Sequence, residues 1–288
     1  MAEFAIRILV PRPLTSADSG EVVLKAIVKH FPGHLPDRYG SLEPLRHKFN
    51  TQRLDLILNE WGHLYFMASG NLNLFVNFGA PRSLRPRHPV IALSFQSEHE
   101  EDLDHVSRFV YEICEAFKAE YAMAHILTQK ELDERLGEKL LRPTSPPEPP
   151  VDQIVEKMRD AVRRKGFAEV LRGLEITGLG THRLRKYLPD LYWLTVFGLP
   201  YVEILERSKL CAAPSQQVKE LSYGGVAVKL TRDLKDTAEE WNKFKSVRKQ
   251  CKHHLNSNVF FDPSAPSGHS YRVPSFIFPP DMYKQLDV

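Results

Sequence analysis

Cysteine and long apolar runs are both scarce in this chain of 288 residues. The three cysteines, Cys114, Cys211 and Cys251, lie far apart and form no C-x-x-C pair, which argues against a disulfide framework or a thiolate zinc site. No apolar run approaches the roughly 20 residues that a membrane-spanning helix needs. Residues 1–13 place no basic region before an apolar stretch, unlike a signal peptide. We therefore expect a cytoplasmic protein without a membrane partner.

Signatures of catalysis and of cofactor binding are also missing. The chain has no G-x-S-x-G nucleophile elbow. Residues 177–182 hold a G-x-G alone, without the further residues that phosphate-binding loops require. Clusters of histidine at 30–34, 99–105 and 251–254 lack a recognised spacing of metal ligands. We predict no catalytic residue, no cofactor and no metal, and the alternative is an enzyme whose site has no known signature.

Charge of one sign is not in large excess, because Lys and Arg number 39 against 36 Asp and Glu, a net charge of +3. This balance does not demand nucleic acid, which we do not expect as a partner. Locally, acids crowd residues 98–120 and basic residues crowd 157–186. Opposite poles can steer a charged protein partner, although two solvated helix faces would give the same pattern. The basic stretch, with Arg163, Arg164 and Lys165, leaves open an accessory protein of a bacterial defence or secretion system that contacts nucleic acid.

A proline-rich stretch at residues 143–150 marks the clearest boundary in the chain. Proline removes a backbone donor and disfavours a helical conformation in the residue before it. The stretch predicts a linker between an N-terminal half, 1–142, and a C-terminal half, 151–288. The sequence alone leaves open whether the two halves fold separately or share one sheet.

Hydrophobic periodicity predicts the elements of the first half. Alternating or clustered apolar residues indicate strands at 4–10, 64–68, 72–78 and 90–95. Apolar residues at helical spacing indicate helices over 22–31, 54–61 and 103–117. Residues 35–45 are expected to form an irregular loop.

The second half is predicted in the same way. Helices are expected over 151–174 and 241–255, and a further helix is expected to begin near Pro200. Strands are expected at 191–197 and 226–230, with an edge strand among the prolines of 273–278. Helices and sequential strands interleave without a regular β-α-β order, which predicts an α+β fold with antiparallel sheets, packed helices and two αβ halves. Cys114 and Cys251 lie on apolar helix stripes and are expected in the core.

Two stretches combine aromatic and turn-forming residues in specific patterns. The first is Pro-x-Arg-Tyr-Gly-x-x-Glu-Pro at 36–44, and the second is Tyr-Trp-x-x-x-Phe-Gly-x-Pro-Tyr at 192–201. Together with Phe-Phe-Asp at 260–262, these patterns resemble the fifty-second immunity-protein family of bacterial polymorphic toxin systems. The residues that carry the resemblance are Arg38, Tyr39, Gly40, Glu43, Pro44, Tyr192, Trp193, Phe197, Gly198, Pro200 and Tyr201.

This resemblance implies a non-catalytic α+β protein that binds a cognate toxin and neutralises it in the cytoplasm of the producing cell. Its motif residues are aromatic and structural, so it brings no catalytic residue to this chain. A toxin that is a nuclease would offer a basic cleft, and the acidic run would suit such a cleft. The candidate toxin-binding residues are therefore Glu98, Glu100, Glu101, Asp102 and Asp104.

Overall fold

The structure is a computed structural model of the whole chain. It describes residues 2–41, 44–62, 65–79, 87–97, 104–128, 130–131, 134, 184–262, 265–266 and 268–282. The proline-rich stretch at 143–150 and the helix expected over 151–174 lie outside these residues.

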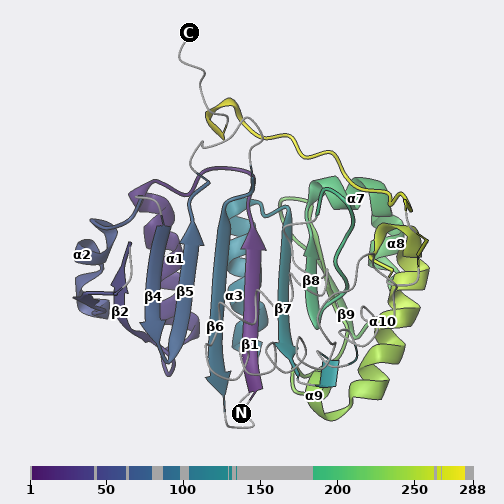
Figure 1. Ribbon diagram of the computed structural model, residues 1–288, viewed down its shortest axis with the longest axis horizontal. Helices are drawn as coiled ribbons and strands as arrows, with labels where there is room; N and C mark the ends of the chain where they lie inside the picture. Colours follow the sequence, from purple (N-terminus) through teal and green to yellow (C-terminus); the bar gives the residue numbers. More distant parts are fainter. Residues whose placement is uncertain are drawn as a thin grey trace, which may run out of the picture.

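One antiparallel sheet of ten strands forms the centre of the protein (Figure 1). Its strands follow the order β3-β2-β4-β5-β6-β1-β7-β8-β10-β9. Their bounds are β1 (Ala2–Leu9), β2 (Pro36–Gly40), β3 (His47–Lys48), β4 (Tyr65–Gly70), β5 (Leu72–Asn77), β6 (Val90–Ser97), β7 (Tyr121–Leu127), β8 (Leu194–Phe197), β9 (Gln217–Glu220) and β10 (Val226–Lys229).

Helices cover the sheet, which confirms the α+β class. The helices of the first half are α1 (Ala17–His30), α2 (Leu54–Leu58) and α3 (Asp104–Phe117). In the described part of the second half they are α7 (Leu199–Leu205), α8 (Arg207–Cys211), α9 (Asp236–Glu239) and α10 (Trp241–Leu255). The helices predicted at 22–31, 54–61, 103–117 and 241–255 correspond to α1, α2, α3 and α10.

Aromatic contacts show that α1 and α10 lie on opposite faces of the sheet. Phe4 of β1 stacks on Phe95 of β6 at 4.9 Å between ring centroids, and Phe31 at the end of α1 lies 5.3 Å from Phe95. Strand β1 pairs with β7 so that Ala5, the residue after Phe4, lies opposite His125. Because successive side chains of a strand point to opposite faces, His125 lies on the face opposite Phe4. There its ring lies 5.6 Å from Phe244 of α10.

The two halves of the chain share this sheet. β7, the last described strand of the first half, pairs with β8, the first strand of the second half. The register aligns Tyr121 with Phe197 and Ala124 with Leu194. Both strands are buried on both faces, so the junction between the halves lies in the hydrophobic core. This answers the question that the sequence left open.

Two local predictions are wrong. Residues 36–40, expected in a loop, form strand β2, which pairs with β3 on one side and with β4 on the other. Residues 273–278, expected to add an edge strand, form no strand in the described chain. Pro274 lies within this segment and Pro279 and Pro280 follow it, and none of the three can donate to a ladder. The segment crosses one end of the sheet (Figure 1), where His88 packs between Phe276 and Phe278.

Within the residues that the structure describes, no helix is both long enough and apolar enough to cross a membrane.

Candidate functional site

The residues of the first family-like motif belong to an edge region of the sheet. Tyr39 of β2 is buried, and its ring lies 5.9 Å from Phe66 and 6.4 Å from Phe49. Arg38 is exposed and lies opposite Lys48 of β3. Gly40 ends β2 and Pro44 is exposed, whereas Glu43 lies outside the described residues. Tyr39 therefore anchors the strand, and Arg38 presents a charged motif side chain at the surface.

The residues of the second motif lie in the core at the junction of the halves. Tyr192, Trp193, Phe197 and Tyr201 are all buried. Gly198 caps the start of α7, and a proline follows in its first turn, as proline favours that position. Burial raises the pKa of Tyr201 well above its ordinary value, so this phenol stays protonated. The motif residues build the core, consistent with a structural rather than a reactive role.

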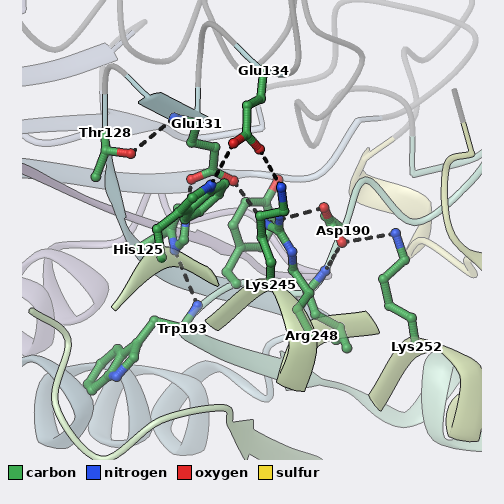
Figure 2. A network of polar contacts seen from close by, with 12 residues as sticks. His125, Thr128, Glu131, Glu134, Asp190, Trp193, Lys245, Arg248 and Lys252 are labelled. Atoms are coloured by element: carbon green, nitrogen blue, oxygen red, sulfur yellow. Dashed lines mark hydrogen bonds and ion pairs between the residues drawn. The ribbon is translucent and has the colours of Figure 1, made fainter. Parts of the chain in front are cut away.

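A buried polar network joins β7 to α10 (Figure 2). His125 donates from Nε2 to Glu131 Oε2 at 2.7 Å, and Arg248 Nη1 donates to Glu131 Oε1 at 2.8 Å. His125 Nδ1 accepts the backbone N–H of Trp193 at 3.3 Å, so its proton resides on Nε2. The side chains of His125 and Glu131 are each 1% exposed. Arg248 therefore supplies a counter-charge to the buried Glu131 carboxylate.

The network continues along one stripe of α10, where cations lie three and four residues apart. Lys252 Nζ lies 3.1 Å from Asp190 Oδ1, and Arg248 Nη1 lies 3.6 Å from Asp190 Oδ2. Lys245 Nζ donates to Glu134 Oε2 at 2.8 Å. Figure 2 shows the acids approaching this stripe from segments outside α10. The helix is thus tied to the sheet by charge as well as by its apolar residues.

The hydrogen bonds of the network lower the pKa of Glu134. Burial alone would raise the pKa of this carboxyl, but hydrogen bonds from Lys245 and from Trp241 Nε1 outweigh it and lower the pKa. Glu134 is therefore ionised at neutral pH and stays paired. Since each acid of the network has a cation partner, we interpret the cluster as a structural element that stabilises the packing of α10 on the sheet rather than as a reactive site.

An open cleft of about 850 Å³ lies across the outward side of α3. The end of α1 and residues 31–34 form one wall, and Lys219 of the edge strand β9 stands on the other side. From α3, Arg108, Tyr111, Glu112 and Glu115 line it at helical spacing. We refer to this surface as the α3 cleft.

Acids in the α3 cleft are held by groups of the protein itself. Glu112 accepts hydrogen bonds from Lys29 Nζ at 2.6 Å and from His30 Nε2 at 2.8 Å. These hydrogen bonds, that of Lys29 first, lower the pKa of Glu112. Glu115 accepts the backbone N–H of Ser222 at 2.8 Å and also its hydroxyl. The charge of Glu112 is therefore compensated within the fold, whereas Glu115 is held in place by neutral donors.

Of the five candidate toxin-binding residues, the structure describes Asp104. It begins α3 and forms an ion pair with Lys229 of β10 at 3.3 Å. The other four lie outside the described residues: Glu98, Glu100, Glu101 and Asp102. The role of all five in binding stays a prediction. Among the described side chains, no group of three or more His, Cys, Asp or Glu residues is arranged to hold a metal ion.

The cysteines differ sharply in accessibility. Cys114 and Cys251 are buried, as expected of core residues, whereas Cys211 is exposed. Burial raises the pKa of the Cys251 thiol to about 12 and also raises that of Cys114. Thiolate is the reactive form, so we expect one thiol of the native protein to react with a chromogenic disulfide reagent at neutral pH. In the Cys211→Ser variant the native protein should not react; rapid reaction of that variant would contradict the packing described here.

Comparisons with known proteins give a fold but no family. No family model matches the chain, and no curated protein matches it. Among solved structures, the Pseudomonas aeruginosa T6SS protein PA0821 is similar, with a TM-score of 0.53 and 13% sequence identity. The similarity covers 96% of this chain and 79% of that chain. At this identity the likeness shows a shared fold, which extends over nearly the whole chain.

Proposed function

We propose that this chain is an immunity protein that binds and neutralises a cognate bacterial toxin delivered by a type VI secretion system, without catalysing a reaction. The observation that carries the proposal is the fold shared with the Pseudomonas aeruginosa T6SS protein over 96% of the chain. A similarity of this extent favours a secretion-related role for the whole chain rather than for one half of it. The motif resemblance at 36–44 and 192–201 supplies the immunity role.

The side-chain chemistry of the described residues fits a binding protein. The buried network around Glu131 and the acids of α3 are engaged in internal ion pairs and hydrogen bonds. Groups held in this way stiffen the scaffold and keep the surface groups at fixed positions. A rigid surface loses little conformational entropy when it binds, and such preorganisation raises affinity.

The test is capture followed by neutralisation. We expect the tagged protein, retrieved from a lysate of its host, to bring down one partner in stoichiometric amount. The partner's toxic domain, expressed alone in a laboratory strain, should arrest growth, and co-expression of this chain should restore it. An unrelated tagged protein expressed to the same level is the control. Growth arrest that persists with this chain present would overturn the proposal, because an immunity protein must neutralise what it binds.

A further inference from the structure

We propose that the α3 cleft is the surface that receives an acidic segment of the toxin, with Arg108 and Lys219 as its contact cations. This inference rests on the proposed function and specifies where and by what chemistry the partner binds. The charges are the opposite of those that the sequence suggested. There, acidic residues of this chain would meet a basic cleft of the toxin; here, cations of this chain meet acidic residues of the toxin.

The first step of the argument concerns the acids of the cleft. Glu112 is occupied by Lys29 and His30 at 2.6 and 2.8 Å, and Glu115 by the backbone and hydroxyl of Ser222. These hydrogen bonds use part of the acceptor capacity of each carboxylate, and Lys29 also gives Glu112 a counter-charge, so both acids are less available to a basic side chain than free carboxylates would be. The acids of the cleft therefore belong to the scaffold, and the groups left for a partner are the cations.

Arg108 and Lys219 differ from Lys29, which forms an ion pair with Glu112. Both are exposed, and within the described part of the chain no carboxylate forms an ion pair with either. Lys219 Nζ lies 4.4 Å from the centre of the Tyr111 ring, a cation–π contact that holds the ammonium over the cleft without neutralising it. Arg108 lies one turn before Tyr111 on the same side of α3. Two uncompensated cations thus share one concave surface.

The shape of the cleft suits a peptide segment. Its volume of about 850 Å³ lies in the range of ligand-binding clefts, which hold several side chains. Residues 31–34 contribute a wall beside Lys29 and His30, so a bound segment would contact both apolar and charged groups. A guanidinium binds a carboxylate with two parallel hydrogen bonds, and an ammonium binds it as a point charge. Asp or Glu side chains are therefore the groups that this surface recognises.

The same residues disfavour nucleic acid as the occupant. Single strands are bound by stacking bases on exposed aromatic faces. In the α3 cleft, Lys219 lies over the Tyr111 ring, and Phe31 is only 1% exposed. Neither of these two rings offers an open face for a base, which favours an acidic peptide.

The cleft is tested first with a probe that does not require the toxin. A short fluorescein-labelled oligo-glutamate peptide should bind the full chain at low salt, as measured by fluorescence anisotropy. The double variant Arg108→Glu with Lys219→Glu should weaken this binding about tenfold or more, because attraction becomes repulsion at two contacts. The matched control is Lys243→Glu with Lys249→Glu, two exposed cations of α10 on the opposite side of the sheet. This control changes the net charge equally and should bind as the parent does.

The outcomes separate this inference from the proposed function. Equal loss of peptide binding in both double variants would show a general charge effect and overturn the inference. Displacement of the peptide by inorganic phosphate at constant ionic strength would indicate a small-anion site and would also overturn it. The captured toxin gives the second readout. If the Arg108/Lys219 variant still binds and neutralises it as the parent does, the inference fails while the immunity function stands. If peptide binding depends on the cleft but the parent chain does not restore growth, the proposed immunity function is wrong, whereas the cleft remains a binding site for acidic peptides.

Discussion

Replacing Glu131 by glutamine is expected to lower the free energy of unfolding by about 3 kcal/mol. Glu131 is buried and accepts from both His125 and Arg248. Glutamine keeps the shape of the side chain but removes its charge, so Arg248 loses its nearest counter-charge. Asp190 lies farther away, at 3.6 Å, and is shared with Lys252. A buried cation with incomplete compensation is costly because water cannot replace the lost partner.

The measurement is urea unfolding followed by circular dichroism. Glu220→Gln is the matched control, because Glu220 also pairs with an arginine, Arg207, but their side chains are 58% and 44% exposed. Exposed pairs contribute about 0–1 kcal/mol, so this variant should unfold close to the parent. If Glu131→Gln had the same free energy of unfolding as Glu220→Gln, the network would not stabilise the packing of α10 on the sheet, and its interpretation as a structural element would be wrong.

Sequence patterns could predict the elements that have one apolar and one polar side. Helices α1, α3 and α10 and the strand β5 were recognised because each carries a periodic apolar stripe. Strand β7 was missed because Ala122, Met123 and Ala124 give no alternation in a strand that is buried on both faces. Strand β2 was assigned to a loop because its proline, glycine and charged residues favour turns, and its pairing with β4 overrides that preference.

The candidate sites were harder to predict because their partners are distant in sequence. Glu112 lies 83 residues from Lys29, and Arg248 lies 117 residues from Glu131. A charge count along the chain treats Glu112 as part of an exposed acidic run, whereas the fold compensates it. The signals available in advance were His125 within an apolar stretch and three cations on one stripe of α10, and neither identifies its partner. Pairings of this kind depend on the tertiary fold, which local pattern does not encode.

The second large effect is expected at Gly198, a residue of the motif that suggested the family. Gly198 follows β8 and caps α7, whose Tyr201 and Val202 N–H groups both donate to its carbonyl at 3.0 Å. Its own N–H donates to the Glu120 carbonyl at 3.0 Å. Its φ of −76° is open to any residue, so the requirement for glycine here is not conformational. The requirement comes from the close approach of the neighbouring chain.

A Cβ atom at position 198 would lie 2.5 Å from the Cα of Glu120 and would also meet the Ala119 carbonyl oxygen. Both are backbone atoms immediately before β7, so relief requires the two strands that join the halves of the protein to move apart. We expect Gly198→Ala to reduce the free energy of unfolding by about 3 kcal/mol, at the upper end of overpacking effects. Gly33→Ala is the control, because nothing lies within 4 Å of the added methyl group there, and its effect should stay within about 0.5 kcal/mol.

Urea unfolding of both variants, followed by the fluorescence of the buried Trp193 and its fellow tryptophans, makes the comparison. Equal stability of the two variants would show that the junction of β7 and β8 tolerates separation. The halves would then be less tightly coupled than their shared sheet indicates. The expected difference would instead give the glycine of the Phe-Gly-x-Pro pattern a physical cause. It is required where the second half of the chain joins the sheet of the first, because any larger residue would keep the two backbones apart.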